Sequence, residues 1–496
     1  MLTFNLIGLV LVSRMPAKIG LDEVISSAAR ASGIAADHSS WKLDGSAHVQ
    51  NADQTFDLVF DGHLRYRSSI AGVLPSVDGY DGTTAWISGP TGLAHPEAFQ
   101  ARDAARLLAW TQSGEWAKSD GPLTKRLASG GSGPVIELGF SDSVGTGRLT
   151  LDPNTYLPTS LEFTDDKWSF DNYKRFGKRS FATTIVHKSG AETDTFDISS
   201  ACSQRVDRAA FAQPQAAYGD VDFVGDLSTV AMKRVGSYMF IRPKIDGQDV
   251  GWFFLDTGAD AMCIDPAVAE KLNMDIVGAD SVNGAVAVDQ YKICRGKSLE
   301  LGGMTFKRPV YLELDLSAIG KALGLDVAGV CGYDMIARAD LDVDTQGNLI
   351  HVYRPGAAKL PGGATWTPIR FDSNTPCTEC AFAGGDLGIF SLDTGSGNTV
   401  DFCSPAVDKY HLLERKDLKP SNTGGAGGVA KSWAGPIDWF ELGGSRFENP
   451  TVGFQVVKTG ALATKYHVGN VGMGFMGQFK RLILDYAHER IAFVKN

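Results

Sequence analysis

The triplet Asp-Thr-Gly occurs twice in this chain, as Asp256-Thr257-Gly258 and as Asp393-Thr394-Gly395. A lone triplet of this kind arises easily by chance. Here each copy follows an apolar run that is typical of a strand, Trp252 to Leu255 and Ile389 to Leu392. Because glycine permits a tight chain reversal, each pattern predicts a carboxylate at the tip of a strand.

Two carboxylates at hydrogen-bond distance cannot both be ionised without a large like-charge cost, so they share one proton. The ionised member can take a proton from a trapped water while the protonated member polarises a carbonyl group. This chemistry hydrolyses a peptide bond without a metal or a covalent intermediate. Asp256 and Asp393 are therefore the candidate catalytic residues. In the alternative, a silent binding module, the triplets only form turns, but a turn needs no carboxylate in both copies.

The triplets belong to a longer internal repeat. Glu300-Leu301-Gly302-Gly303 returns as Glu441-Leu442-Gly443-Gly444, and 44 residues separate Asp256 from Glu300 where 48 separate Asp393 from Glu441. We align a third block, Val330-Cys331-Gly332, with Gly472-Met473-Gly474. Ordered matches in two units of about 130 residues predict a duplicated fold. Packing about a pseudo-twofold axis would bring the two aspartates face to face.

From Val230 to Asn496 the chain resembles the aspartic peptidases, specifically the bacterial retropepsin-like branch, with two retropepsin-type lobes fused into one pepsin-like chain. Phe254 to Asp260 is similar to the retropepsin active-site sequence, and Leu392 to Ser396 is nearer to the pepsin form. The resemblance implies a mainly β fold with two β-barrel lobes, residues 230–360 and 361–496, and an active site in the cleft between them. It also implies a peptide or protein substrate, no cofactor and no metal.

The same resemblance assigns supporting residues around the two aspartates: Thr257, Gly258, Thr394, Gly395 and Ser396. It implies that the two threonines carry interlocked hydroxyl hydrogen bonds that brace the loops. Ala259 and Asp260 are candidate substrate contacts. Because Ser396 stands where the first copy has Ala259, we expect a serine hydroxyl to bond one carboxylate only and to make the pair electrically asymmetric.

Two stretches rich in turn residues, about Ala279 to Lys292 and Asn422 to Pro436, are suited to mobile hairpins that close over a substrate. The candidate substrate-binding residues in these hairpins are Asn283, Gly284, Gly425 and Trp433. Tyr291 and Trp433 are the candidates for the place of a pepsin-type flap tyrosine.

Residues 1–17 are expected to be a leader, either a signal peptide or a disordered N-terminus. Leu2 to Val12 is apolar but too short to span a bilayer, no Lys or Arg precedes it, and no clear cleavage site follows it. Lys18 to Ser32 shows the apolar spacing of a helix, which Gly33 ends.

Short alternating stretches bounded by turn residues follow, and they predict an antiparallel sheet with one helix over Pro96 to Gly114. Residues 18–204 are thus expected to form a β-rich N-terminal domain, joined by a linker at 205–229 to the first lobe. Three stretches of this domain are vaguely similar to the curved sheet of lipoprotein-carrier proteins: Tyr80 to Trp86, Leu151 to Pro158 and Tyr173 to Phe181. Their aromatic residues either line an apolar groove for a lipid or peptide or pack in a core, and core packing is favoured.

The chain has 47 basic and 57 acidic residues, and its net charge of −10 argues against a nucleic-acid partner. Nine histidines and seven cysteines lie without paired metal-ligand spacing. The single CxxC, Cys377 to Cys380, is a disulfide if the protein is exported and a pair of thiols otherwise. Cys263 and Cys403, which follow the two triplets, are expected to be small core residues.

No run in the chain approaches 18 apolar residues, so no integral membrane span is expected. The leader-like start favours a periplasmic or secreted location and leaves the cytoplasm open. Because both aspartates lie in one chain, a monomer is expected. The rival hypothesis for function is a non-catalytic peptide- or lipid-binding envelope protein built on a peptidase fold.

Overall fold

The computed structural model describes residues 20–34, 39–118, 121–128, 133–190, 192–283, 288–385, 387–415, 417–425 and 428–495. Strands take up 49% of the structure and helices 16%, which confirms the expected mainly β fold. We call residues 20–204 the N-terminal region, residues 230–360 the first half and residues 361–496 the second half. The expected leader at 1–17 lies outside the described residues.

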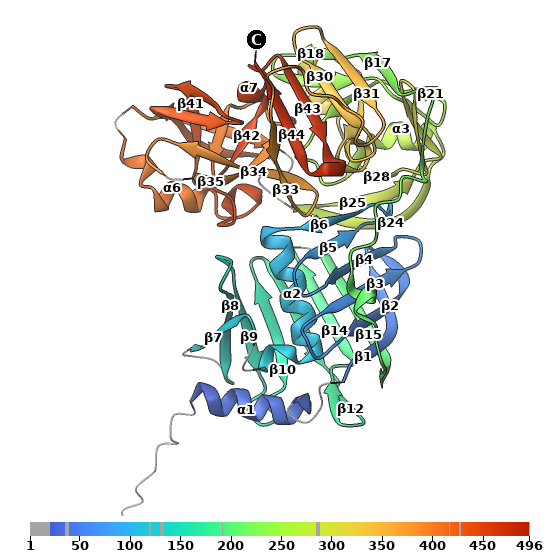
Figure 1. The fold of residues 1–496 in the computed structure, drawn as a ribbon, viewed down its shortest axis with the longest axis vertical. Coiled ribbons are helices and arrows are strands. Elements are labelled where there is room, and N and C mark those ends of the chain that lie inside the picture. The colour runs from blue at the N-terminus through green and yellow to red at the C-terminus, as the bar shows by residue number, and fades with distance from the viewer. Residues whose placement is uncertain are drawn as a thin grey trace, which may run out of the picture.

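The N-terminal region is built on one antiparallel sheet of 13 strands (Figure 1). In sheet order the strands are β6 (Ala94–Glu97), β5 (Ala85–Ser88), β4 (Ser76–Tyr80), β3 (Tyr66–Ala71), β2 (Ala52–Phe60), β1 (Trp41–Val49), β15 (Glu192–Ser203), β14 (Thr184–Ser189), β11 (Asp166–Asp171), β10 (Pro158–Phe163), β9 (Thr146–Leu151), β8 (Val135–Phe140) and β7 (Leu123–Ala128). A separate hairpin pairs β12 (Lys174–Phe176) with β13 (Arg179–Phe181).

Two helices accompany this sheet. Helix α1 (Leu21–Ser32) ends at Gly33, whose φ of 77° places it in the left-handed region. Helix α2 (Phe99–Ser113) starts later than the predicted Pro96, because Pro96 and Glu97 continue β6 and pair with β5. A short 3₁₀ helix, Glu115–Ala117, follows α2.

The aromatic side chains of the N-terminal region form a packed core against α2, as favoured above. Trp86 and Trp110 are each 1% exposed, and Phe181 is equally buried. Each indole N–H finds a backbone acceptor, Trp86 at the Phe211 carbonyl (2.9 Å) and Trp110 at the Leu64 carbonyl (2.8 Å). These rings fill the interior rather than line an apolar groove.

The segment expected to be a linker, 205–229, is only partly one. After a 3₁₀ turn at Arg208–Phe211, strand β16 (Val221–Phe223) pairs with β27, and β17 (Leu227–Ala231) pairs with β31. The sequence did not predict these two strands. The segment is rich in alanine, and each strand is a short edge strand of a sheet that later residues form.

The first half contains an eight-stranded sheet and a five-stranded sheet. The eight strands in order are β18 (Lys233–Val235), β19 (Tyr238–Ile241), β22 (Trp252–Leu255), β29 (Val327–Cys331), β23 (Met262–Ile264), β28 (Val310–Glu313), β25 (Val288–Arg295) and β24 (Asp275–Asn283). The five-stranded sheet joins β16 to β27 (Met304–Lys307), β26 (Ser298–Leu301), β20 (Lys244–Ile245) and β21 (Gln248–Asp249). Its helices are α3 (Pro266–Lys271), α4 (Ser317–Leu323) and α5 (Tyr333–Ile336).

The second half repeats this strand order. Its ten-stranded sheet contains β33 (Arg370–Asp372), β34 (Thr375–Phe382), β35 (Leu387–Asp393), β42 (Gly469–Gly472), β36 (Val400–Phe402), β41 (Thr451–Gln455), β38 (Gly428–Pro436) and β37 (Lys419–Gly425), with β39 (Trp439–Leu442) and β40 (Ser445–Glu448) beyond β34. Its helices are α6 (Ser404–Lys409) and α7 (Met473–Met476), with 3₁₀ turns at Leu412–Glu414, Ala461–Ala463 and Tyr486–His488. The predicted duplication of the fold is visible in this matching order.

A six-stranded sheet joins the two halves. It contains β17, β31 (Leu349–Tyr353), β30 (Asp340–Asp344), β43 (Arg481–Asp485), β44 (Arg490–Val494) and β32 (Trp366–Pro368), and its central pair is β30 with β43. Figure 1 shows these strands on the side of the molecule far from the N-terminal region. One apolar core continues through both halves.

Candidate active site

Strands β22 and β35 carry the two Asp-Thr-Gly triplets to the middle of their sheets. Strand β22 runs parallel to β29 and pairs Leu255 with Cys331, and β35 runs parallel to β42 and pairs Leu392 with Val471. Apolar, fully buried residues fill both strand ends. Each aspartate is therefore fixed by a central strand rather than by an exposed loop.

Two threonines tie the triplets together across the interface of the halves. Thr257 donates its hydroxyl to the Leu392 carbonyl (2.7 Å), and Thr394 donates its hydroxyl to the Leu255 carbonyl (2.7 Å). Each hydroxyl also accepts the backbone N–H of the other threonine at 3.0 Å. Both side chains are 2% exposed. The interlocked hydroxyl hydrogen bonds are thus present and symmetric.

This bracing brings Asp256 and Asp393 into hydrogen-bond contact through their carboxyl groups. The Gly258 N–H donates to Asp256 Oδ1 at 2.8 Å, and the Ser396 N–H donates to Asp393 Oδ1 at 2.9 Å. A Cβ on Gly258 would lie 2.6 Å from Asp393 Cγ, and one on Gly395 would overlap the Asp256 carboxylate. Both glycines are required by this close approach.

The two carboxyl groups differ in charge preference. Burial raises the pKa of Asp256 well above its usual range, and the neighbouring charge of Asp393 raises it further. Burial also raises the pKa of Asp393, but an Asn470 amide that donates to Asp393 Oδ2 at 2.9 Å opposes this rise. The Asn470 amide therefore favours an arrangement in which Asp393 carries the negative charge and Asp256 holds the shared proton.

The asymmetry does not come from the expected serine hydroxyl. Ser396 reaches Asp393 through its backbone N–H, while its hydroxyl accepts the Asn398 N–H at 3.3 Å. The side-chain oxygen is turned toward its own turn, where a local backbone donor is available.

Asn470 is the site residue that the sequence comparison missed, because the third repeat block was aligned two residues out of register. The strand pairing places Asn470-Val471-Gly472 against Val330-Cys331-Gly332. Gly332 and Gly472 confirm this register, because each lies against the residue that follows its own triplet. A Cβ on Gly332 would lie 2.6 Å from the Ala259 carbonyl oxygen, and a Cβ on Gly472 would lie 2.8 Å from the Ser396 carbonyl oxygen. Asn470 also accepts the Ser391 hydroxyl at 2.7 Å, which orients its amide toward Asp393.

Ala259 and Asp260 lie directly beyond the first triplet. The Ala259 carbonyl accepts the Tyr333 N–H at 3.0 Å. Asp260 contacts the turn between β33 and β34: its carbonyl accepts the Asn374 amide (2.7 Å), and its carboxylate accepts the Thr375 hydroxyl (2.8 Å). Asp260 keeps an exposed surface, while partial enclosure raises its pKa to about 6.

The two expected hairpins are present as β24–β25 and β37–β38. Asn283 and Gly425 are the last residues of β24 and β37, and Gly284 lies outside the described residues. Trp433 lies in β38, pairs with Phe454 of β41 and is 37% exposed. Tyr291 pairs with Asp280 within the first hairpin. No hydrogen bond or ring contact between described residues joins Trp433 to the two aspartates.

All seven cysteines are free thiols. Cys377 and Cys380 are three positions apart in β34, so they lie on opposite faces of the strand. Cys403 is buried and Cys263 is half-buried against the core, as expected of small core residues. Within the described ranges, no group of three His, Cys, Asp or Glu side chains is placed to hold a metal ion. None of the helices described is long and apolar enough to cross a membrane.

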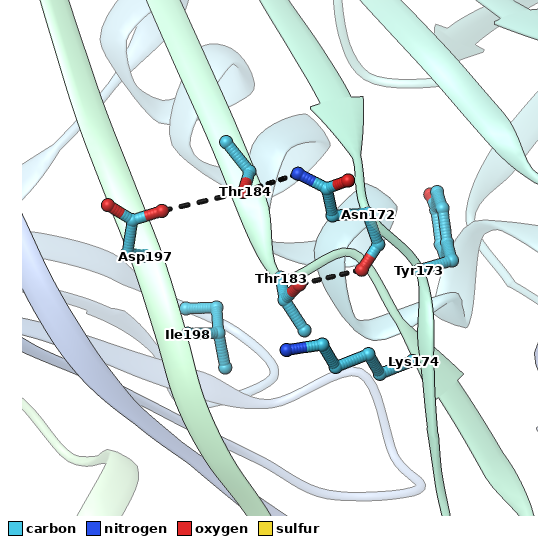
Figure 2. A pocket seen from close by; sticks show the side chains of 7 residues that line it. All are labelled: Asn172, Tyr173, Lys174, Thr183, Thr184, Asp197 and Ile198. Atoms are coloured by element: carbon cyan, nitrogen blue, oxygen red, sulfur yellow. Dashed lines mark hydrogen bonds between the residues drawn. The ribbon is translucent and has the colours of Figure 1, made fainter.

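A surface hollow lies away from the triplets, in the N-terminal region (Figure 2). It has a volume of about 540 Å³ and is lined by Asn172, Tyr173, Lys174, Thr183, Thr184, Asp197 and Ile198. The Asn172 amide donates to the Thr184 hydroxyl at 3.1 Å, and the Thr183 hydroxyl donates to the Asn172 carbonyl at 2.6 Å. Its lining mixes hydrogen-bonded polar side chains with the ring of Tyr173 and the apolar side chain of Ile198.

A known protein family matches the part of the chain around the first triplet. Residues 241–335 match the family model described as aspartyl protease. The matched residues include Asp256, Asp260, Cys331 and Gly332. No curated protein matches the chain.

Three solved structures are similar to parts of the chain. A LolA superfamily protein from Nitrosomonas europaea is 13% identical, with 39% of this chain and 98% of that chain covered and a TM-score of 0.30. A DUF1329 family protein from Desulfovibrio piger is 12% identical, with 38% and 95% covered and a TM-score of 0.29. A retropepsin-like aspartic protease from Rickettsia conorii is 16% identical, with 26% and 89% covered and a TM-score of 0.20.

Proposed function

We propose that this protein is an aspartic endopeptidase in which Asp256 and Asp393 activate a water molecule. The observation that supports the proposal most strongly is the hydrogen-bonded carboxyl pair, held by reciprocal threonine hydrogen bonds from two halves of one chain. A turn or a binding module needs no such pair, because two buried carboxyl groups in contact destabilise the fold unless they share a proton.

In the proposed reaction, ionised Asp393 accepts a proton from water as the water oxygen attacks the peptide carbonyl carbon. Protonated Asp256 donates its proton to the carbonyl oxygen, which gives a neutral diol. The C–N bond then breaks as Asp393 returns its proton to the leaving nitrogen, and Asp256 recovers a proton from the diol. Each carboxyl group thus ends in its starting state. Thr257, Gly258, Thr394, Gly395 and Ser396 support the pair, and Asn470 keeps the charge on Asp393.

The proposal includes a domain division into an N-terminal domain over 18–204 and two peptidase lobes over 230–360 and 361–496. A single chain supplies both aspartates, which favours a monomer. The substrate is a peptide or protein. The apolar run Leu2 to Val12 favours a periplasmic or secreted location.

The test is cleavage of an unfolded protein substrate by the full-length chain. Asp256→Asn and Asp393→Asn should each abolish cleavage, and a pepstatin-type inhibitor should bind the unaltered protein. Asp249→Asn is the matched control, because Asp249 is exposed and its carboxylate pairs with Arg242 in the same half. A folded Asp256→Asn protein with full activity would exclude the proposed pair.

The second candidate function, a non-catalytic lipid- or peptide-binding protein, predicts binding without cleavage. The N-terminal region offers it little support, because buried aromatic rings such as Trp86, Trp110 and Phe181 fill a core rather than line an apolar groove. A peptide library that is bound but never cut would favour this alternative.

A further inference from the structure

The pseudo-twofold relation of the halves creates two equivalent ends around the aspartate pair. At one end Asp260 contacts Asn374 in the turn between β33 and β34. At the other end Gly397, its equivalent in the second half, packs against Tyr238 at the start of β19. A substrate chain that passes over the pair must extend toward both ends. We call them the Asp260 end and the Gly397 end.

The N-terminal region contacts the Asp260 end through β6 and the start of α2. His95 Nε2 lies 2.9 Å from Asn374 Oδ1, so only Asn374 separates His95 from Asp260. The Ala98 N–H donates to the Phe371 carbonyl at 2.8 Å. These contacts place the N-terminal region against the turn that holds Asp260.

Helix α2 also contacts the segment that leads into β42 of the second half. Gln100 accepts the Thr464 hydroxyl at 3.1 Å, and the Tyr466 hydroxyl donates to Asp103 at 3.0 Å. The ring of Phe99 packs edge-on against His467 with a centroid distance of 5.7 Å.

The hairpin β24–β25 is fastened to the N-terminal region from the opposite side. The Ala279 N–H donates to the Gln50 carbonyl at 2.8 Å, and the Gln50 amide donates to Asp280 at 2.7 Å. Leu74 adds a small apolar cluster with Ile293. The hairpin, the Asp260 turn and the segment before β42 therefore all meet the same region of the chain, as Figure 1 shows for β24, β25 and β33 above β6.

The Gly397 end has no matching cover. Among the described residues, no hydrogen bond, ion pair or ring contact joins the N-terminal region to Gly397, to the β18–β19 turn or to the hairpin β37–β38. Hairpin β37–β38 pairs only with β41, and Tyr238 packs on Phe254 of its own half. The symmetry of the halves is thus broken at one end only.

The cover at the Asp260 end is a permanent part of the core rather than a loose contact. Leu93, His95 and Ala98 are 5%, 6% and 8% exposed, and Leu93 belongs to the core shared by the two halves. Arg338, which is 1% exposed, donates to the Thr91 carbonyl at 2.9 Å. Opening this end would expose buried apolar surface and unpair buried polar groups.

We propose that the N-terminal region closes the Asp260 end of the substrate site, so that the protein holds a substrate by its free amino terminus and cuts a short distance from it. This inference rests on the proposed function. The Asp260 carboxylate, the charged group with an exposed surface at the closed end, attracts an ammonium group and repels a carboxyl terminus.

The reach of the chain limits where the cut falls. Asp260 lies four positions after Asp256, and an extended chain spans at most about 3.6 Å per position, or about 14 Å in all. A bound strand advances about 3.3 Å per residue, so at most about four substrate residues fit between the aspartate pair and the closed end.

The experiment uses the full-length protein and two libraries of peptides of about 12 residues, identical except that one has acetylated amino termini. Products are read by mass spectrometry. Cuts should fall within the first four bonds of the free peptides, and acetylation should lower kcat/KM about tenfold, the value of one favourable charge contact of about 1.4 kcal/mol. Asp260→Asn should remove most of this preference, while Asp249→Asn should retain it.

A second readout separates charge recognition from a structural effect of the substitution. The preference for the free amino terminus should weaken as the pH falls below about 6, where Asp260 becomes protonated. Asn374, Thr375, Asp372 and Glu97 face this group. His467 is paired with Asp372 at 2.9 Å, and His95, whose pKa burial lowers, lies beyond Asn374.

Two results would overturn the inference. Asp256-dependent cuts spread through the interior of both libraries at equal rates would show that the Asp260 end is open, and they would leave the proposed peptidase activity standing. Absence of any Asp256-dependent cut in either library would overturn the proposed function and this inference together.

Discussion

Asn470→Val removes the amide hydrogen bond to Asp393 and restores the apolar residue that the first half carries as Val330. A hydrogen bond to a charged group contributes about 1.5–3 kcal/mol, and 1.36 kcal/mol corresponds to one pKa unit. The amide favours ionised Asp393, so its loss should raise the pKa at which the doubly protonated pair loses its first proton by about 1–2 units. The second proton leaves from Asp256 while Asp393 is already ionised, so the upper pKa should stay nearly unchanged.

The assay is kcat/KM against pH with a fluorogenic peptide. The acid limb should move to higher pH by about 1–2 units and the basic limb should hold its position, so that the active range narrows. Asn398→Ala is the matched control, since the Asn398 amide bonds Asp401 rather than the pair. An acid limb that stays in place in Asn470→Val, or a shift of the basic limb alone, would refute the assignment of the charge to Asp393.

Four further outcomes are expected. Thr257→Val should lower the free energy of unfolding by about 3 kcal/mol in urea titrations, because it unpairs a buried carbonyl and a buried N–H, whereas Thr257→Ser should retain most of the stability. Cleavage should decline at high pH as Asp256 loses the shared proton, measured as the basic limb of the rate profile. Burial lowers the pKa of His187, but the hydrogen bonds and charges of two flanking carboxylates outweigh burial and raise it to about 9. The stability that His187 adds is complete below about pH 6.5 and is lost as the pH rises through 9, so the difference in unfolding free energy between wild type and His187→Gln should shrink by about 3 kcal/mol between pH 5.5 and pH 9.5. Mild oxidation should not link Cys377 to Cys380, as read by peptide mapping, because the two lie on opposite faces of β34.

A different result would contradict each of these four expectations. Equal stability of the Val and Ser variants at position 257 would mean that the hydroxyl bonds contribute nothing. A cleavage rate that climbs steadily through pH 9 would contradict a shared proton. A stability difference for His187→Gln that is constant with pH would show an uncharged imidazole, and a Cys377–Cys380 disulfide would require β34 to open.

The sequence alone predicted that the aspartates and their threonines come together, because their signal is a strand followed by a triplet and repeated in order. Their catalytic role stays a prediction. The same reasoning missed Asn470. The third block was aligned on its glycines, and three glycines in six residues, from Gly472 to Gly477, offered a false match. The correct match was Asn470-Val471-Gly472. In this register a buried apolar residue, Val471, is equivalent to Cys331, and Gly472 is equivalent to Gly332. Asn470, which bonds Asp393, then takes the place of Val330.

The position of the N-terminal region could not be predicted, because the residues that dock it belong to no repeating pattern. Gln50 lies in a hairpin turn, and His95 lies in a four-residue edge strand. Their partners are more than 200 residues away in the chain. The start of α2 was predicted three residues early. Proline is common at helix starts, but here Pro96 pairs with Trp86 of β5 and belongs to the edge strand β6.

The pairing of β30 with β43 has an evolutionary consequence. In an enzyme assembled from two identical subunits, every substitution appears on both sides of the symmetry axis, so a residue that helps one aspartate must be tolerated beside the other. Here a single polypeptide supplies both β30 and β43, so the sequence of each half can change independently of the other. Asn470 at the position equivalent to Val330, and Gly397 at the position equivalent to Asp260, are differences that two identical subunits could not carry.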